Sequence, residues 1–279
     1  MNISIAERIH EYLNDPASDL PVFSQTALIV QEEAARAEPD TKKILECIER
    51  DQVLTMEVLK VANAPFYRGI KKVTRIQDAM VRIGLREMIN CVMLASQRAN
   101  YRSTNASLQH YATGLWKHSV ACAFGANWLA QKCGYPELGP EAFISGLIHD
   151  VGKLLVLKAL TSPAEQGHDI PRITKTAAEE FIAALHMEYG AALIERWHLP
   201  EVYATICRDH HRDDYEATNI LLVLVRMANA VCAKLGIGLF VNSDIVLVTC
   251  SEAGVLGLSD ITLAELEVAV EDYLVRSEF

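Results

Sequence analysis

Apolar residues recur every three to five positions along most of this chain, with charged residues between them. The repeat is clear in residues 42–59, 115–133 and 141–160. This spacing places apolar side chains on one side of an α-helix, whereas a half-buried strand alternates at every second residue. Residues 245–248 are the one short strand candidate in the sequence. The pattern therefore predicts an all-α fold.

Residues typical of helix ends support this prediction. Gly134 directly follows the periodic segment 115–133, and glycine adopts at low cost the left-handed conformation that closes many helices. Thr262 and Glu265 have the spacing of a capping box, in which the two side chains satisfy backbone amides at a helix start. We therefore expect a last helix that reaches about Val275.

Two polar segments interrupt the helical pattern. Residues 99–110 carry loop-forming residues, and residues 161–173 contain two prolines and a glycine. We expect the first segment to join an amino-terminal helical lobe, residues 1–108, to a second helical lobe, residues 109–279. The second segment is expected to be a long surface loop. Both lobes would belong to one composite module.

Composition narrows the class of protein. Of the 279 residues, 51% are apolar, and this fraction excludes a disordered chain. The net charge of −10 disfavours nucleic-acid binding through a general basic field. No apolar run approaches the length of about 20 residues that spans a bilayer, so no membrane association is expected. The seven cysteines include no Cys-x-x-Cys pair, which is typical of a reducing cytoplasm.

One cluster of basic residues leaves a local nucleic-acid patch as an alternative, although such a run is more often a solvated loop and helix end. Two aromatic residues, Phe66 and Tyr67, lie among the basic ones. The basic residues are Lys60, Arg68, Lys71, Lys72 and Arg75.

An ionisable pair, His149 and Asp150, lies inside the apolar segment 141–160. Because an isolated charge is costly to bury, these groups must be hydrogen-bonded, ion-paired or bound to a metal. In the structural interpretation, His149 bonds a carbonyl and Asp150 pairs with Lys153 or Lys158. In the functional interpretation, the pair binds a metal.

Four further histidines favour the metal interpretation. Imidazole nitrogens and a carboxylate suit zinc, iron or manganese. Adjacent histidines diverge by about 100° on a helix, so the last two would bind separately, or one would orient the other; alternatively, both lie on the surface. The remaining histidines, 10, 110, 168 and 198, are interpreted as structural or solvated. The four candidates are His118, His186, His210 and His211.

The order of these residues resembles the HD superfamily of metal-dependent phosphohydrolases, and residues 19–235 resemble its HDOD (HD-related output domain) branch. The resemblance is carried by an ordered series of short motifs, each weak alone. The motifs are Leu20-Pro21, Asp51-x-x-Leu54-Thr55, Leu59-x-x-Ala62-Asn63, Ala79-x-x-x-Ile83-Gly84, the stretch GLIHDVGK at 146–153, and Trp197-x-Leu199-Pro200 followed by His210-His211.

The resemblance implies an amino-terminal helical lobe followed by a modified, HD-like helical lobe. HDOD modules are found in bacterial signalling proteins, generally without an established enzymatic activity. The chain departs from active HD enzymes at Asn229, which stands where their last aspartate is expected. It also lacks two features of the related cyclic di-GMP phosphodiesterases: their Gly-Tyr-Pro signature is missing after His211, and Gly114 stands where they have a glutamate. The leading hypothesis is therefore a stand-alone, cytoplasmic regulatory module that acts through a signalling protein partner without efficient catalysis.

The alternative is a divergent metal-dependent phosphohydrolase that acts on a nucleotide or another phosphate ester. In relatives with activity, the corresponding ligands hold one or two divalent metals, here iron, manganese or zinc, that activate water. This alternative assigns catalytic roles to Asp150 and Lys153, with Lys153 contacting a phosphate oxygen. The metal ligands would be His118, His149, Asp150, His186, His210 and His211.

Overall fold

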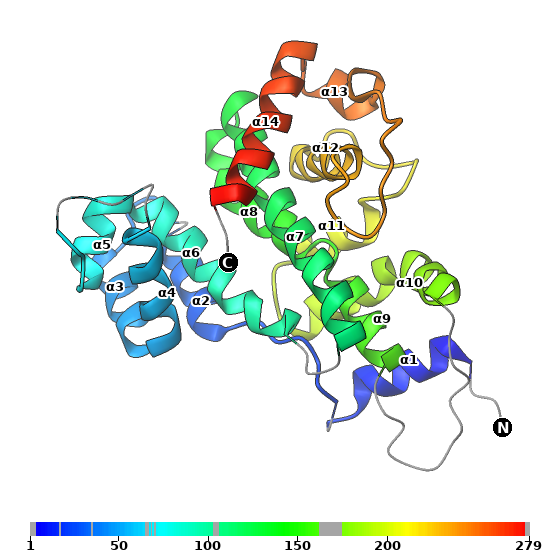
Figure 1. The fold of residues 1–279 in the computed structure, drawn as a ribbon, viewed down its shortest axis with the longest axis horizontal. Helices are drawn as coiled ribbons and strands as arrows, with labels where there is room; N and C mark the ends of the chain where they lie inside the picture. Colours follow the sequence, from blue (N-terminus) through cyan, green and yellow to red (C-terminus); the bar gives the residue numbers. More distant parts are fainter. Residues whose placement is uncertain are drawn as a thin grey trace. The chain divides into compact units, whose positions relative to one another are not determined.

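A computed structural model of the chain consists of helices joined by turns and loops, and its described residues contain no strand (Figure 1). It describes residues 4–276 except 17, 35, 65–66, 68, 70, 103–105 and 162–174. The all-α prediction is confirmed. Most of the expected loop at 161–173, together with Phe66, Arg68 and His168, lies outside the described residues.

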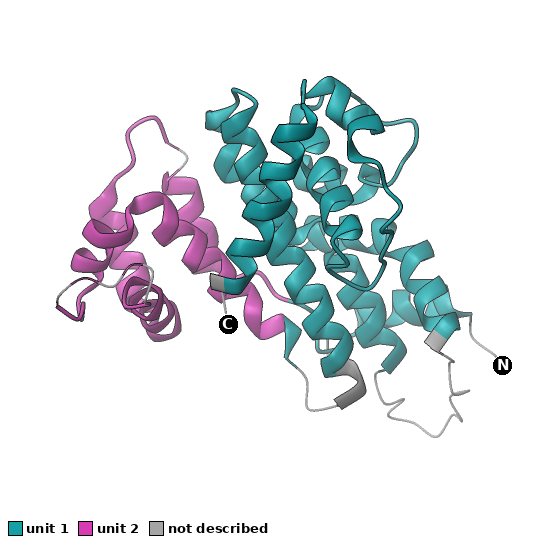
Figure 2. Cartoon of the chain, turned by 45° about the horizontal axis from the view of Figure 1, so that its top comes forward, with its two compact units in different colours: residues 1–21, 101–277 teal, residues 22–100, 278–279 magenta. Residues whose placement is uncertain are grey.

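The chain divides into two compact units (Figure 2). The first contains residues 1–21 and 101–277, and the second contains residues 22–100 with the last two residues of the chain. This division differs from the expected lobes of 1–108 and 109–279 at the amino terminus. The first helix packs within the first unit, where the Tyr189 hydroxyl donates a hydrogen bond to the Ala6 carbonyl at 2.9 Å. The two-lobe domain organisation stays a prediction.

The second unit is a small helical bundle in which Asp51 causes a break that the periodicity does not show. Its carboxylate accepts hydrogen bonds from the backbone amides of Val53 and Leu54 at 3.0 and 3.1 Å, so a new helix starts there. The single helix suggested by residues 42–59 is therefore two helices. The helices of this unit are α2 (Gln25–Ala34), α3 (Thr41–Arg50), α4 (Gln52–Ala62), α5 (Ile76–Ile83) and α6 (Leu85–Arg98), followed by the short helix η1 (Ala99–Tyr101).

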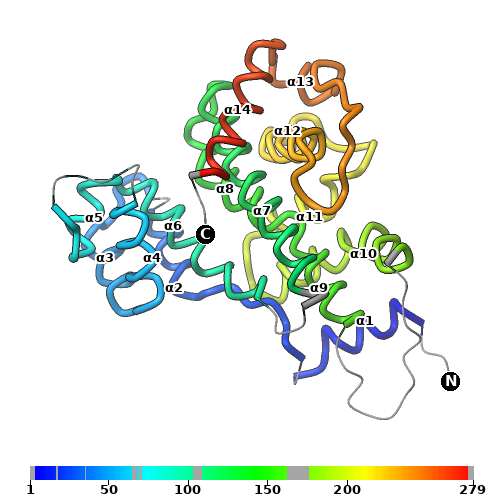
Figure 3. The backbone as a smooth tube through the Cα atoms, viewed as in Figure 1, coloured from blue at the N-terminus to red at the C-terminus, as the bar shows by residue number. Residues whose placement is uncertain are grey.

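In the first unit the long helix α7 packs against α8, α9, α12 and α14, and α10 packs against α9 and α11. The tube in Figure 3 follows the chain through these helices. They are α1 (Ile5–Asn14), α7 (Ala106–Lys132), η2 (Pro136–Leu138), α8 (Gly139–Ile148), α9 (Val151–Thr161), α10 (Lys175–Arg196), α11 (Glu201–Asp209), α12 (Ile220–Lys234), η3 (Leu247–Thr249), α13 (Ser251–Val255) and α14 (Asp260–Arg276).

The helix predicted over 141–160 is interrupted at the His149-Asp150 pair. Helix α8 ends before His149, whose amide still bonds the Ser145 carbonyl at 2.9 Å, and α9 begins after Asp150. The amide of Lys153 donates to the Asp150 carbonyl at 2.9 Å, a tight turn of the three-residue type. The two ionisable side chains therefore project from a bend between two buried helices.

Helices α9 and α10 approach closely because two glycines face each other. A Cβ at Gly152 would overlap the carbonyl oxygen of His186, and a Cβ at Gly190 would lie 3.3 Å from the amide nitrogen of Gly152. Side chains at these positions would push the helices apart. The glycines thereby set the spacing between His186, on α10, and Asp150, which directly precedes α9.

Other helix ends agree with the sequence in part. Gly134 has a φ of 83° and closes α7, as predicted. The last helix does not start at a Thr262 cap: the Ser259 hydroxyl accepts from the Thr262 amide at 3.2 Å, and α14 begins at Asp260. Residues 245–248 form no strand, and a turn of 3-10 helix covers Leu247–Thr249 instead.

Candidate metal centre

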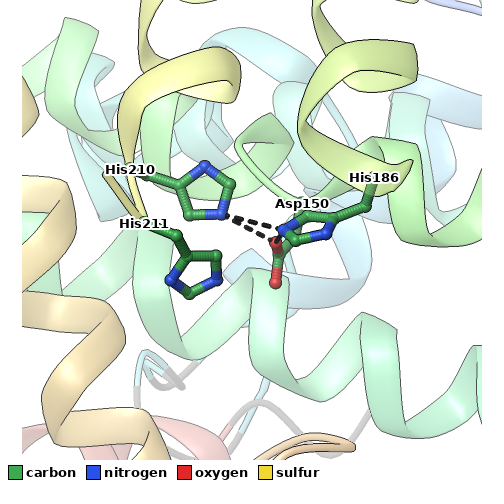
Figure 4. Close-up of side chains that lie close together, drawn as sticks. All are labelled: Asp150, His186, His210 and His211. Carbon is green, nitrogen blue, oxygen red and sulfur yellow. Dashed lines mark hydrogen bonds and ion pairs between the residues drawn. The ribbon is translucent and has the colours of Figure 1, made fainter. Parts of the chain in front are cut away.

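The six predicted ligands converge in the first unit around Asp150. His118 comes from α7, His149 and Asp150 from the bend between α8 and α9, and His186 from α10. His210 and His211 follow the last residue of α11. Figure 4 shows His186, His210 and His211 around the Asp150 carboxylate, with contacts joining His210 to both Asp150 and His186.

The two carboxylate oxygens of Asp150 divide the histidines into two groups. Oδ2 lies 3.1 Å from Nε2 of His118 and 3.4 Å from Nε2 of His149. Oδ1 lies 3.2 Å from Nε2 of His210 and 3.6 Å from Nε2 of His186. We call His118, His149 and Asp150 the first ligand group, and Asp150, His186, His210 and His211 the second; both have the proximity expected of metal ligands.

Backbone carbonyls set the orientation of the four buried imidazoles. In each ring Nδ1 faces a carbonyl oxygen, which only accepts hydrogen bonds, so Nδ1 carries the proton. A neutral ring of this kind presents its Nε2 lone pair to Asp150, the arrangement that metal-bound histidines use. The carbonyl partners are Ile237 for His118 (3.1 Å), Gly146 for His149 (2.9 Å), Ala183 for His186 (2.9 Å) and Cys207 for His210 (2.9 Å).

These orientations place lone pairs against each other. Nε2 of His118 lies 3.3 Å from Nε2 of His149, and Nε2 of His186 lies 3.4 Å from Nε2 of His210. Two acceptor nitrogens at this distance repel unless a proton or cation lies between them. Ligands bound tetrahedrally at about 2.0–2.1 Å are about 3.3 Å apart. Donor type, orientation and spacing therefore all fit a divalent transition metal.

Burial keeps most of the cluster in the protonation state that binds metals. Burial lowers the pKa of His186 to about 4. Burial also lowers the pKa of His149. Burial acts to raise the pKa of Asp150, but the Lys153 ammonium, His149 and the hydrogen bonds from His118 and His210 together outweigh it and hold that pKa well below its usual range.

His118 is the exception among the buried rings. Burial acts to lower its pKa, but the hydrogen bond and charge of Asp150 act more strongly together, so the pKa is raised. A proton on Nε2 of His118 is donated to Asp150 at 3.1 Å. A metal in the first ligand group has to displace that proton.

The Lys153 ammonium, like the proton on His118, competes with a metal for Oδ2 of Asp150. Its Nζ lies 2.6 Å from Oδ2 of Asp150 and 5.0 Å from the ring centre of Phe240. Of the two lysines considered as partners for Asp150, Lys153 makes the pair, whereas Lys158 binds Asp19 at 2.7 Å. Oδ1, on the side of the second ligand group, has no lysine against it among the described residues.

His210 and His211 join the same ligand group although they are neighbours in sequence. The expected divergence applies within a helix, but α11 ends at Asp209, and the two rings lie 4.2 Å apart by their centres. His211 is exposed, and its ring lies 5.3 Å from that of His186. It therefore forms the water-accessible edge of the cluster.

Arg226 holds the backbone that directly follows α11, a role that no sequence motif predicted. Its Nη1 donates to the carbonyl oxygens of His210 and Arg212, both at 2.9 Å, and its Nε binds Glu252 at 2.6 Å. The guanidinium also stacks over Tyr215 at 3.9 Å. The sequence feature that could have indicated this role is the presence of an arginine within the otherwise apolar segment 220–228.

A loop after α12 covers His118. Gly238, with a φ of 123°, brings its backbone against the ring, because a Cβ there would lie 3.1 Å from Nδ1 of His118. The Ile237 carbonyl in the same loop is the acceptor that orients the ring. Gly236 and Gly238 in the sequence could have indicated this close approach.

Asn229, expected at the position of the last aspartate, is half-buried in α12. Within the described part of the chain, no hydrogen bond or ion pair joins it to the histidines. Its assignment to the metal site stays a prediction.

A helical module with a buried His-Asp cluster defines a protein of the HD type. The sequence model of the HDOD domain matches residues 20–213, more than half of the chain. The chain therefore belongs to the HDOD family, as its motifs suggested. Among the described residues, no helix combines the length and apolar character needed to cross a bilayer.

Solved structures share the fold at low sequence identity. An HDOD domain protein of unknown function from Geobacter sulfurreducens is 22% identical, with a TM-score of 0.73 and 99% of each chain covered. A protein from Shewanella amazonensis, named as a candidate metal-dependent phosphohydrolase, is 19% identical, with a TM-score of 0.66 and 97% of each chain covered. These likenesses establish the fold.

Two uncharacterized proteins are similar in sequence. One, from Treponema pallidum, is 26% identical over 75% of this chain. The other, YuxH from Bacillus subtilis, is 27% identical over 49% of this chain. The matches cover 39% and 35% of those proteins, so the chain corresponds to less than half of each.

Proposed function

We propose that this chain is a metal-binding HDOD signalling module that regulates a protein partner in the cytoplasm. The single observation that supports metal binding best is the orientation of the four buried imidazoles: each donates Nδ1–H to a carbonyl and presents Nε2 to Asp150. Neutral imidazole nitrogens and one carboxylate suit zinc, iron or manganese.

The second ligand group is the better candidate for a tightly held ion. Its carboxylate oxygen, Oδ1, lies near His186 and His210, and the exposed His211 offers a path for exchange with water. In the first ligand group, Oδ2 is shared with the Lys153 ammonium at 2.6 Å. We therefore expect one divalent metal per chain, held by His186, His210, His211 and Asp150.

A regulatory role is favoured over efficient hydrolysis because the cluster is poor in carboxylates. Asp150 is the one acidic residue in either ligand group among the described residues. Asn229, a neutral amide, stands at the position where active relatives are expected to have another carboxylate. With a lysine on one oxygen of Asp150, little negative charge is left to hold a second metal.

Metal analysis of the purified chain tests this proposal. We expect about one equivalent of zinc, iron or manganese by elemental analysis, and its loss in His210→Ala. His118→Ala should keep most of the metal, and His10→Ala, a change at an exposed histidine, should keep all of it. A protein that binds no divalent metal after reconstitution, or that loses it equally in His10→Ala, would overturn the proposal.

A divergent phosphohydrolase is the second candidate, supported by the sharing of Asp150 between two ligand groups. A bound divalent metal supplies Lewis-acid activation of water and of a phosphoryl oxygen. The ammonium of Lys153 would contact a phosphate oxygen of a nucleotide or phosphate ester. Metal-loaded protein should be screened on phosphomonoesters, nucleotides and cyclic dinucleotides. Turnover no greater than that of Asp150→Ala would exclude this activity.

A further inference from the structure

One face of helix α14 packs against the other helices of the first unit. The buried side chains on this face are apolar, and Tyr273 stacks on Phe124 of α7 with ring centres 4.1 Å apart. Two ion pairs add to the contact, Glu265 with Lys132 at 2.9 Å and Glu267 with Lys234 at 2.6 Å. These contacts set the rotation of the helix about its axis. The buried apolar residues are Leu263, Leu266 and Val270.

The same helix exposes a second apolar line. Ile261, Val268 and Val275 are 74%, 58% and 73% exposed. They are spaced by seven residues, which is two helical turns, so they lie on one side of the helix along about 21 Å. We call these three residues the α14 stripe. Helices of water-soluble proteins usually bury one apolar face and keep the other face polar. Packing within the first unit therefore does not explain why these exposed positions are apolar.

The charges on α14 indicate what would cover the stripe. The helix contains five acidic residues and a single basic one, Arg276. Glu265 and Glu267 are neutralised by lysines of the same unit. Among the described residues, Asp260 and Glu271 make no ion pair, and both are exposed beside the stripe.

We propose that the α14 stripe is a docking surface for an amphipathic helix of a partner protein whose apolar residues are flanked by lysine or arginine. Helices pair through apolar positions repeated over heptads, with charges at the margins selecting the partner. This inference rests on the proposed function, because it specifies the partner class of the regulatory module.

Two other occupants fit the charges less well. A second copy of the chain would place another helix with five acidic residues and one basic residue against the stripe, and an excess of like charge opposes such pairing. An anionic lipid surface attracts basic helices, not acidic ones. The stripe is also small compared with the roughly 800 Å² per partner of a stable interface, which is consistent with transient association.

The test uses the full chain and two synthetic helices of about three heptads. Both peptides carry leucine at the apolar positions; one is flanked by lysine and the other by glutamate. Fluorescence anisotropy should show binding of the lysine peptide only. Val268→Ser should raise its Kd about tenfold, the contribution of one buried valine. Val268→Lys, which adds charge repulsion, should raise it further.

Val81→Ser is the matched control, because Val81 is a helical valine that is 83% exposed in the other unit. It should leave the Kd unchanged. Equal binding to wild type and Val268→Ser, or equal binding of both peptides, would overturn the proposal. So would a dimer, detected by sedimentation, that Val268→Lys dissociates, since a second copy would then cover the stripe. Peptide binding requires no metal, so metal analysis of the same samples separates failure of docking from failure of metal binding.

Discussion

Arg226 and His210 are joined by a hydrogen bond of 2.9 Å from a guanidinium Nη1 to a backbone carbonyl. The same nitrogen also binds the carbonyl of Arg212, so one side chain spans the end of α11. Glu252 holds the guanidinium from the other side at 2.6 Å. The position of two proposed ligands, His210 and His211, therefore depends on a residue of α12 that does not itself approach Asp150 in any described contact.

We predict that Arg226→Lys weakens metal binding by about ten- to a hundredfold, the usual effect of removing a group that orients a ligand. Lysine keeps the charge but lacks the planar fork that reaches several carbonyls. Competition with a chelating dye gives the metal Kd. Arg208→Lys, in α11 with long contacts to Glu195 and Glu201 of 3.5 and 3.8 Å, serves as the control. An unchanged Kd in Arg226→Lys would contradict the assignment.

Lys153→Met should raise the metal content from about one toward two equivalents per chain. The change frees Oδ2 of Asp150, which now binds the ammonium at 2.6 Å, and leaves a buried carboxylate that a metal can neutralise. Elemental analysis gives the stoichiometry, and melting with and without chelator gives the dependence of stability on metal. Lys158→Met, in the same helix but paired with Asp19, should keep the wild-type stoichiometry. A Lys153→Met protein still limited to one metal would argue against competition at Oδ2.

Gly152→Ala should destabilise the first unit by about 3 kcal/mol, because the new methyl group would overlap the His186 carbonyl and backbone atoms cannot move aside cheaply. Urea unfolding measures the change. Gly254→Ala is the control: this glycine lies in α13, where a Cβ would have no neighbouring atom within 4 Å, so alanine should be neutral or slightly stabilising. Equal stability of the two variants would show that α9 and α10 separate easily.

The contacts of Glu33 should stabilise the second unit at neutral pH and should no longer do so in acid. The hydrogen bond from Lys43 lowers the pKa of Glu33, with further help from the Asp40 amide and Arg36. A carboxyl with a lowered pKa stabilises the folded state above its unfolded pKa of about 4.3 and stops doing so as pH falls through the folded value. Glu33→Gln should therefore reduce stability at neutral pH and have little effect near pH 3.

Urea unfolding of Glu33→Gln between about pH 3 and 7 measures this contribution. Glu46→Gln is the matched control, because Glu46 is exposed on α3 and its contact with Lys42 is 3.9 Å long. Its effect should be small at every pH. A difference between wild type and Glu33→Gln that grows toward acid would reverse the predicted sign.

The order of histidines, through its resemblance to HD proteins, allowed the convergence of these side chains to be predicted, whereas their role as metal ligands stays a prediction. His118 lies on α7, His186 lies on α10 and His210 directly follows α11, and each was found at the cluster. The bend at His149 could not be predicted from periodicity, since the apolar pattern continues through it. Arg226 was missed for a related reason: its role depends on carbonyls of α11, which a pattern of side chains does not describe.

The close contact of Gly152 with His186 also limits how this chain can vary. At most buried positions a larger residue can be accommodated if a neighbour becomes smaller. Here the neighbour is main chain, which every residue type carries, so no second substitution can restore the space. The spacing between Asp150 and His186 therefore requires a residue without a side chain at position 152.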